Sequence, residues 1–195
     1  MRYPELRKLM DRVYFSVEDL PEILKIKPES ARVLCSRYTK MGYFVRLKRN
    51  FYTLEERWAN FTYDTFLKSS NLLQVPSYIS FMTALSFYEV TTQVQRGCFE
   101  SASIKRSVLF NRKGITFHFH KLQKKYYSDF IKKDDLFIAI PEKALIDSAY
   151  LCSLGRYKID FNALDFDKLD KKKIRKILER YPLKTKKLVK EQCRI

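Results

Sequence analysis

The chain has 195 residues, of which 46% are hydrophobic and only four are glycine, a composition typical of globular proteins and not of disordered tails. Its net charge of +17 indicates a polyanion or an acidic protein as partner. The sequence has no signal-peptide core near its start and no apolar run approaching the roughly eighteen residues that span a bilayer, so we expect a cytoplasmic protein with no membrane partner.

The N-terminal residues predict two helices. Apolar residues recur at helical spacing over 3–12 and predict the first helix. Ser16 and Asp19 have the spacing of a weak capping box, which predicts that a short second helix begins at Ser16. A tight turn is expected at 25–27. The buried face of the second helix is expected to consist of Leu20, Ile23 and Leu24.

A longer helix and a hairpin follow. Pro28 is expected to open the helix, because proline at the first helical position loses only an N–H that has no partner. Gly42 is expected to end it, because glycine adopts the left-handed conformation without steric cost. Residues 43–47 and 51–54 are rich in aromatic and β-branched residues and predict two strands. The apolar stripe of the helix, expected to face the core, consists of Ala31, Leu34, Cys35, Tyr38 and Met41.

This order of elements predicts a winged helix-turn-helix domain at residues 1–54. In such a domain the second helix of the motif lies in the DNA major groove, and a basic hairpin tip meets phosphate or the minor groove. An alternative is a protein interaction module whose basic helix face is only solvated. The residues expected to bind DNA, on the helix face opposite the stripe and at the hairpin tip, are Ser30, Arg32, Val33, Ser36, Arg37, Lys40, Lys48, Arg49 and Asn50.

The remaining residues predict a linker and a second domain. Residues 55–75 are assigned to the linker, with a connecting helix at 55–71, and residues 76–195 to an α+β domain. The second domain is expected to contain a small mixed or antiparallel sheet. Its predicted elements are a helix at 77–88, a loop or short strand at 91–94, strands at 102–110, 114–120 and 136–140, a hairpin turn at 111–114, and a helix from Pro141 to Gly155.

The C-terminal tail is strongly basic. From Asp160 onward the pattern predicts one or two short helices, broken at Pro182. Residues 104–133 contain 9 Lys and Arg against 1 acid, and residues 171–195 contain 11 against 2. These two blocks either extend a nucleic-acid or partner surface or only solubilise the protein. Their candidate contact residues are Lys105, Arg106, Arg112, Lys113, Lys121, Lys124, Lys125, Lys172, Lys173, Arg175 and Lys176.

The sequence contains no motif of a common enzyme class. It has no glycine-rich phosphate loop, no G-x-S-x-G, no H-E-x-x-H and no cysteine pair at metal-ligand spacing, so its scattered cysteines are expected to be reduced thiols. His118 and His120 share one face of a predicted strand, but without a third ligand nearby we expect no metal site. Glu142 is expected to complement its helix dipole, Lys143 to point to solvent, and both, with Asp147, to have structural or interface roles. We therefore expect no catalytic residue, no cofactor and no enzymatic activity.

Two stretches of the second domain carry a resemblance to a known family. The first is PSYISFMTALSFYEVTTQV at 76–94, and the second is PEKALID at 141–147, which follows a predicted strand. Together with the N-terminal winged helix, they make the chain resemble the AbiEi family of bacterial antitoxins, the regulators of viral-defence loci. These proteins are partners of the AbiEii nucleotidyltransferase toxins in type IV toxin–antitoxin systems. The short, lysine-dense C-terminal end departs from the family. The resemblance rests on Tyr78, Ser80, Ala84, Leu85 and the PEKALID heptad.

The resemblance implies a protein that binds inverted repeats in the double-stranded DNA of its own promoter. It also implies a C-terminal domain that neutralises a nucleotidyltransferase-type toxin, without a stable complex between the two proteins. Arg32, Ser36, Arg37, Lys48 and Arg49 would carry the operator contacts. On this interpretation the chain is a transcriptional autorepressor and antitoxin of an abortive-infection, phage-defence operon.

Three other functions are compatible with the same residues. One is a winged-helix transcriptional regulator that has no toxin partner. The second is an RNA-binding module, since a basic winged helix also binds structured RNA. The third is a nucleic-acid enzyme that uses His118, His120 and nearby carboxylates.

Overall fold

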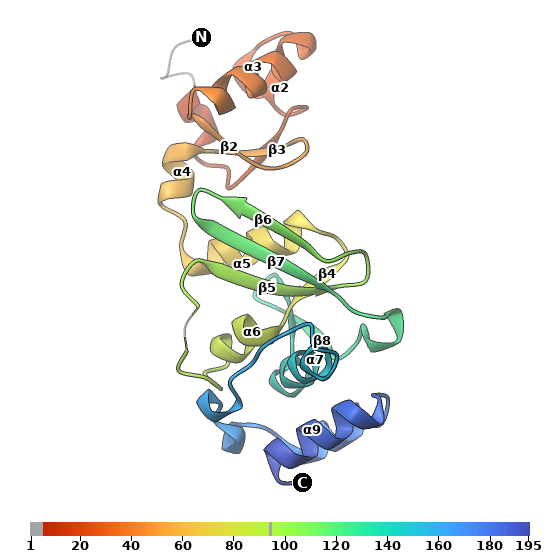
Figure 1. Ribbon diagram of the computed structural model, residues 1–195. Coiled ribbons are helices and arrows are strands. Elements are labelled where there is room, and N and C mark those ends of the chain that lie inside the picture. Colours follow the sequence, from red (N-terminus) through yellow and green to blue (C-terminus); the bar gives the residue numbers. More distant parts are fainter. Residues whose placement is uncertain (1–5, 94) are drawn as a thin grey trace. The chain divides into compact units, whose positions relative to one another are not determined.

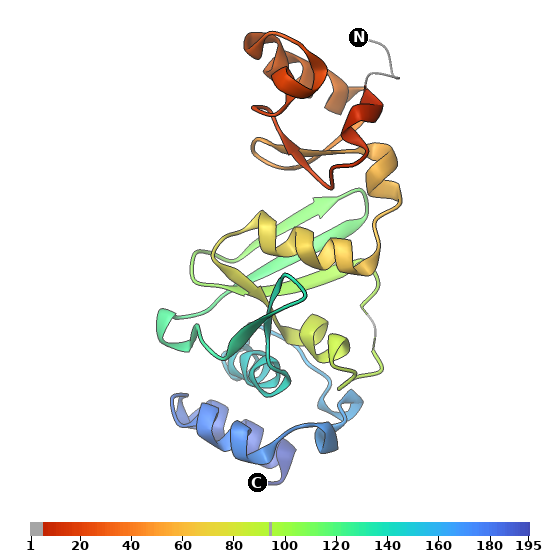
Figure 2. The ribbon, with the colours of Figure 1, turned by 180° about the vertical axis from the view of Figure 1, so that it is seen from behind.

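The computed structural model describes residues 6–93 and 95–195. The chain forms two compact units, one ending at Phe66 and one comprising Leu67–Ile195 (Figure 1, Figure 2). The fold is α+β: the described residues contain eight α-helices, a three-stranded antiparallel sheet and a six-stranded mixed sheet. Within the same residues, no helix is both long and apolar enough to cross a membrane.

The first unit combines helices with the antiparallel sheet, whose strand order is β1–β3–β2. Aromatic rings from the strands pack in its core with aliphatic side chains, and the rings of Phe15 and Phe44 lie edge to face with their centres 5.0 Å apart. The elements are η1 (Arg7–Leu9), β1 (Phe15–Ser16), α2 (Leu20–Leu24), α3 (Pro28–Lys40), β2 (Phe44–Lys48), β3 (Phe51–Leu54), α4 (Glu55–Ala59) and the start of α5 (Tyr63–Leu73).

The main signals in the first unit are confirmed. Pro28 is the first residue of α3, and the turn at 25–27 joins α2 to α3. Gly42, with a φ of +80°, follows the end of α3, and the hairpin strands match their predicted bounds to within one residue. Of the predicted stripe, Ala31, Cys35 and Tyr38 are buried, because they share the face of α3 that meets the sheet.

The start of the first unit differs from the prediction. Of the helix predicted at 3–12, residues 1–5 lie outside the described residues, and the rest forms only the short 3-10 helix η1. Ser16 does not cap a helix, because it belongs to β1 and its N–H and Oγ both donate to Asp19 Oδ2, at 2.6 and 2.8 Å. Helix α2 therefore begins at Leu20, immediately after Asp19.

Two further predictions for this unit are wrong. Met41 is 54% exposed, because α3 ends at Lys40 and the chain turns away before the stripe can continue. The single helix predicted at 55–71 is two helices, α4 and α5, separated at 60–62. The boundary between the two units falls within α5, between Phe66 and Leu67.

The second unit is organised around the six-stranded sheet, whose strand order is β6–β7–β5–β4–β9–β8. Neighbouring strands are antiparallel, except that β5 is parallel to β7 and β4 to β9. Helix α5 covers one face, α6 and α7 cover the other, and α8 and α9 pack on the far side of α7 (Figure 1, Figure 2). Its further elements are β4 (Ser77–Ile79), α6 (Phe81–Phe87), β5 (Cys98–Ser103), β6 (Val108–Arg112), β7 (Ile115–Lys121), η2 (Lys124–Tyr126), β8 (Phe130–Lys133), β9 (Leu136–Ala139), α7 (Pro141–Ser153), η3 (Phe161–Ala163), η4 (Phe166–Lys168), α8 (Lys171–Leu178) and α9 (Leu183–Cys193).

Strand alternation decides which side chains of the sheet meet which helices. In β5, Ser101 Oγ lies 2.8 Å from Ser70 Oγ of α5 on one face. The preceding residue, Glu100, points to the other face, where its carboxylate accepts the backbone N–H of Met82 in α6 at 3.3 Å. Side chains of β5 and β7 that share this second face are therefore brought together beneath α6.

The middle of the chain differs most from the prediction. The helix predicted at 77–88 is strand β4 followed by α6, and the strand predicted at 102–110 is split between β5 and β6. Strand β8 was not predicted, and within 91–94 the structure describes an isolated bridge at Thr91, while Val94 lies outside the described residues. Apolar spacing does not separate a short buried strand from the first turn of a helix, which accounts for β4.

The C-terminal third follows the prediction more closely. Helix α7 begins at Pro141, and Gly155 follows its end. Two helices, α8 and α9, form the basic tail, and Pro182 separates them.

Candidate functional site

The face of α3 that is predicted to bind DNA is exposed. Ala31, Cys35 and Tyr38 occupy the buried side and Leu34 packs half-buried beside them, whereas the residues on the opposite side of the helix point to solvent. Val33 exposes 68% of its surface there, and its apolar side chain suits contact with a thymine methyl group. The exposed residues of this face are Ser30, Arg32, Val33, Ser36, Arg37 and Lys40.

Three arginines from α3 and the hairpin meet in one depression. Arg32 of α3 and Arg46 and Arg49 of the hairpin line a cavity of about 450 Å³, together with Glu18. A guanidinium group presents five N–H donors in a planar fork, which matches a phosphate or the O6/N7 edge of guanine. Donation from the side chain of Asn50 holds the pKa of Glu18 below its usual value, so a carboxylate lies among these cations. The depression can bind an anion through the arginines.

Arg46 is a candidate contact that the sequence analysis missed. It lies in β2 between Val45 and Leu47, which are both buried, whereas Arg46 is exposed. A charged residue flanked by two apolar residues in a strand is the signal that would have identified it, because alternate side chains of a strand point to opposite faces.

The three predicted hairpin-tip residues differ in what they can offer a partner. Arg49 is exposed, and Lys48 is half-buried with its Nζ over an aromatic ring. Asn50 uses its side chain within the unit: Nδ2 donates to Glu18, and Oδ1 accepts the backbone N–H of Val17 at 3.3 Å. Asn50 therefore anchors the hairpin to the segment between β1 and α2.

The other predicted basic residues lie at several places in the second unit. Lys105 and Arg106 lie between β5 and β6, Arg112 and Lys113 lie at the β6–β7 turn, and the remainder of the first block follows or ends β7. All are exposed except Arg112, which is half-buried. The two blocks approach each other where Arg180, which follows α8, donates to Ser128 and pairs with Asp129, and where the rings of Tyr126 and Tyr181 stack with their centres 4.3 Å apart. The residues of the second block, on α8, are Lys172, Lys173, Arg175 and Lys176.

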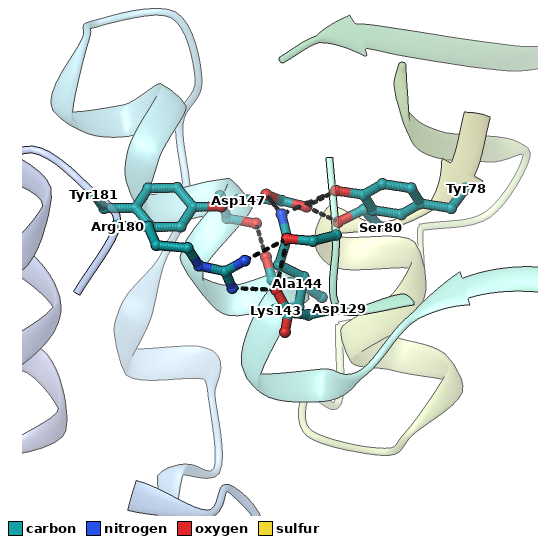
Figure 3. Close-up of polar contacts among 10 residues, drawn as sticks. Tyr78, Ser80, Asp129, Lys143, Ala144, Asp147, Arg180 and Tyr181 are labelled. Carbon is teal, nitrogen blue, oxygen red and sulfur yellow. Dashed lines mark hydrogen bonds and ion pairs between the residues drawn. The ribbon is translucent and has the colours of Figure 1, made fainter. Parts of the chain in front are cut away.

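A buried polar network joins β4 to α7 (Figure 3). Asp147 of α7 is fully buried and accepts the hydroxyls of Tyr78 at 2.9 Å and Ser80 at 2.8 Å. Lys143, one turn earlier on α7 and also fully buried, donates to Asp147 and to the Tyr78 hydroxyl. The Tyr181 hydroxyl completes the network, 3.4 Å from Asp147 Oδ1.

The prediction that Lys143 points to solvent is wrong. Helix α7 is covered by α6 on one side and by α8 and α9 on the other, so its first turns have no solvent-facing side. Burial lowers the pKa of Lys143, while the neighbouring Asp147 opposes this effect by favouring the charged form. Burial and the charge of Asp147 raise the pKa of Tyr78. Because the charges and hydroxyls are paired with one another, the network is suited to holding elements together.

This network also connects the two stretches on which the family resemblance rests. Tyr78 and Ser80 belong to the stretch at 76–94, and Lys143 and Asp147 belong to the stretch at 141–147. Residues far apart in sequence thus form one set of contacts.

A second polar cluster lies on the same face of the sheet. Glu100 of β5 pairs in register with His118 of β7, and His120 Nε2 lies 3.2 Å from Glu100 Oε1. One donor atom from each of the three residues lies within 4.8 Å of the others. The two histidines were noted in the sequence, but Glu100 was not, because only the pairing of β5 with β7 brings it beside them.

No protein family and no curated protein matches the sequence. Among solved structures, the fold is similar to the crystal structure of the RV2827C protein from Mycobacterium tuberculosis, with a TM-score of 0.63. The similarity covers 100% of this chain and 78% of that chain at 9% sequence identity, so it concerns the fold alone.

Proposed function

We propose that residues 1–54 form a winged helix-turn-helix and that the chain is a DNA-binding transcriptional autorepressor, the antitoxin of a type IV toxin–antitoxin operon. The observation that carries the DNA-binding part is the exposed basic surface of α3 and the hairpin, where Arg32, Arg46 and Arg49 line one depression. The antitoxin part rests on the resemblance carried by the stretches at 76–94 and 141–147.

In this proposal α3 enters the major groove of an operator made of inverted repeats. Arg32 and Arg37 reach guanine edges or flanking phosphates, and Val33 contacts a thymine methyl group. Lys40 and Arg49 bind the phosphate backbone, which fixes the position of α3 in the groove.

Binding to the DNA upstream of the gene tests the DNA-binding part. Electrophoretic mobility shifts with a scrambled competitor, at two salt concentrations, should show a specific complex that weakens as salt rises. Arg37→Ala should weaken operator binding by about 1–3 kcal/mol. Lys8→Ala, which removes the same charge from an exposed position on η1, is the matched control and should change binding much less. Equal affinities for the wild type and Arg37→Ala would contradict the assignment of α3 as the recognition helix.

Two further measurements separate the alternatives. Competition with structured RNA identifies an RNA-binding module if RNA displaces the operator. Expression of the neighbouring gene, alone and with this chain, tests the antitoxin part. Growth arrest that this chain relieves supports it, and absence of arrest favours a regulator without a toxin.

A further inference from the structure

We propose that Glu100, His118 and His120 form a binding site for a divalent transition-metal ion. The site lies on the face of the six-stranded sheet beneath α6. The two histidines are two residues apart in β7 and therefore share a face, and the parallel partner strand β5 places Glu100 opposite His118. The topology thus supplies the third ligand that the sequence pattern lacks.

The three donor atoms lie close enough together to bind one ion after side-chain rotation. Tetrahedral coordination with bonds of about 2.0–2.1 Å places neighbouring ligand atoms about 3.3 Å apart. His120 Nε2 and Glu100 Oε1 are 3.2 Å apart, and all three donor atoms lie within 4.8 Å of one another. The imidazole centres of His118 and His120 are 3.8 Å apart, so both rings lie beside the carboxylate, and joint coordination of one ion requires the rings to move apart.

Residues around Glu100 orient its carboxylate as outer-shell partners of metal ligands do. The Tyr157 hydroxyl donates to Glu100 Oε2 at 2.8 Å, and the N–H of Met82 lies 3.3 Å from the same oxygen. These contacts leave Oε1 directed at His120. Phe81 has a φ of +56°, which aromatic residues rarely adopt, and its ring centre lies 4.4 Å from that of His120.

The donor set and the burial favour a borderline transition metal over Mg²⁺ or Ca²⁺, because imidazole nitrogen suits ions such as Zn²⁺ and Co²⁺. Glu100 is 4% exposed and His120 is 6% exposed. A buried carboxylate is stabilised by a nearby positive charge, which in the absence of metal a protonated His120 supplies. A metal ion bound to His120 Nε2 takes the place of that proton and supplies the charge instead.

The site has a route to solvent. His118 is half-buried, and it lines a cavity of about 620 Å³ together with His120, Lys121 and Arg156. Three protein ligands with an open side leave a fourth position for water or a small anion.

The test measures binding of Zn²⁺ and Co²⁺ to the full chain. The chain must carry no histidine tag, because its own two histidines are both in the site. After removal of metal by a chelator, calorimetry should show one Zn²⁺ per chain, and Co²⁺ should give the visible absorption of a four-coordinate ion. In nuclear magnetic resonance spectra, Zn²⁺ should shift the signals of both imidazoles.

Four variants assign the binding to this cluster. His118→Ala and Glu100→Gln should each reduce Zn²⁺ affinity by roughly 100-fold or more, and Tyr157→Phe, which leaves the ligands intact, by about 10- to 100-fold. Cys98→Ser, two residues before Glu100 in β5, is the matched control and should bind as the wild type does. Far-UV circular dichroism checks that each variant is folded, and Tyr157→Phe keeps the test valid if a ligand variant is not.

The proposal is overturned by any of four results, of which three concern the histidine cluster itself. These are less than half a zinc ion per chain in the wild type, unchanged affinity in both His118→Ala and Tyr157→Phe, or imidazole signals that Zn²⁺ does not shift. Loss of binding in Cys98→Ser with full binding in His118→Ala would place the metal on thiols and would also overturn it.

Discussion

Asp147→Asn is expected to be strongly destabilising, although the side chain touches no solvent. The substitution removes the charge that pairs with Lys143, and both side chains have a relative exposure of 0%. It also replaces one carboxylate oxygen by an amide NH2 group. The Tyr78 and Ser80 hydroxyls, which both donate to Asp147 Oδ2, then compete for fewer acceptor sites. Loss of one partner of a buried ion pair costs about 3–5 kcal/mol, because the other charge is left without compensation.

The measurement is equilibrium unfolding in urea followed by two probes. Far-UV circular dichroism reports on both units, whereas the only tryptophan, Trp58, is buried in the first unit. We expect Asp147→Asn to lower the urea midpoint of the part of the dichroism transition that belongs to the second unit by roughly 2 M, for an m-value of about 2 kcal/mol/M. The fluorescence transition of Trp58 should stay in place.

An exposed ion pair gives the matched control. Lys132 and Asp135 lie 3.0 Å apart, with side-chain exposures of 62% and 75%. Asp135→Asn should leave the urea midpoint close to that of the wild type, because exposed pairs are screened by solvent. If Asp147→Asn costs as little as Asp135→Asn, the reasoning about burial is refuted.

The double variant Lys143→Met/Asp147→Leu distinguishes the cost of leaving one buried charge unpaired from the cost of removing both charges. The double variant removes both charges together, so it should cost less than the sum of the two single variants, although the Tyr78 and Ser80 hydroxyls lose their acceptor. A cost equal to the sum of the single variants would mean that the two charges do not compensate each other.

Three smaller predictions concern the first unit. Gly42→Ala should lower the free energy of unfolding by about 1 kcal/mol, because a φ of +80° is unfavourable for alanine even though its Cβ would contact no atom within 4 Å. Urea unfolding followed by Trp58 fluorescence measures this, and an unchanged midpoint would contradict it. In DNA titrations, Arg46→Ala should reduce the magnitude of the slope of log K, the DNA association constant, against log salt concentration by about one. An unchanged slope would mean that Arg46 contacts no phosphate. Asp19→Asn should cost roughly 1 kcal/mol at neutral pH, because donation from Ser16 holds the pKa of Asp19 below 3.8. This contribution is present above pH 3.8 and is lost as the pH falls through the lower folded-state value, so the wild type and Asp19→Asn should converge in acid; a constant difference would refute it.

Local chemistry explains why the first unit was largely predictable. Pro28 and Gly42 act on the backbone next to them, and the stripe on α3 depends only on spacing along one helix. The exposed face of α3 follows from the buried one, so its exposed residues could be identified before the fold was known. Asn50 was placed at the hairpin tip correctly, but its bonds to Val17 and Glu18 depend on a segment more than thirty residues away.

In the second unit the sequence determined by itself the basic blocks, the start of α7 at Pro141 and the break at Pro182. Only the tertiary structure decided that Lys143 is buried and that Glu100 lies beside His118. The physical reason is that burial and contact depend on what covers a helix or pairs with a strand. Those partners, α9 for the helix α7 and β7 for the strand β5, follow from the topology and not from the residues next in the chain.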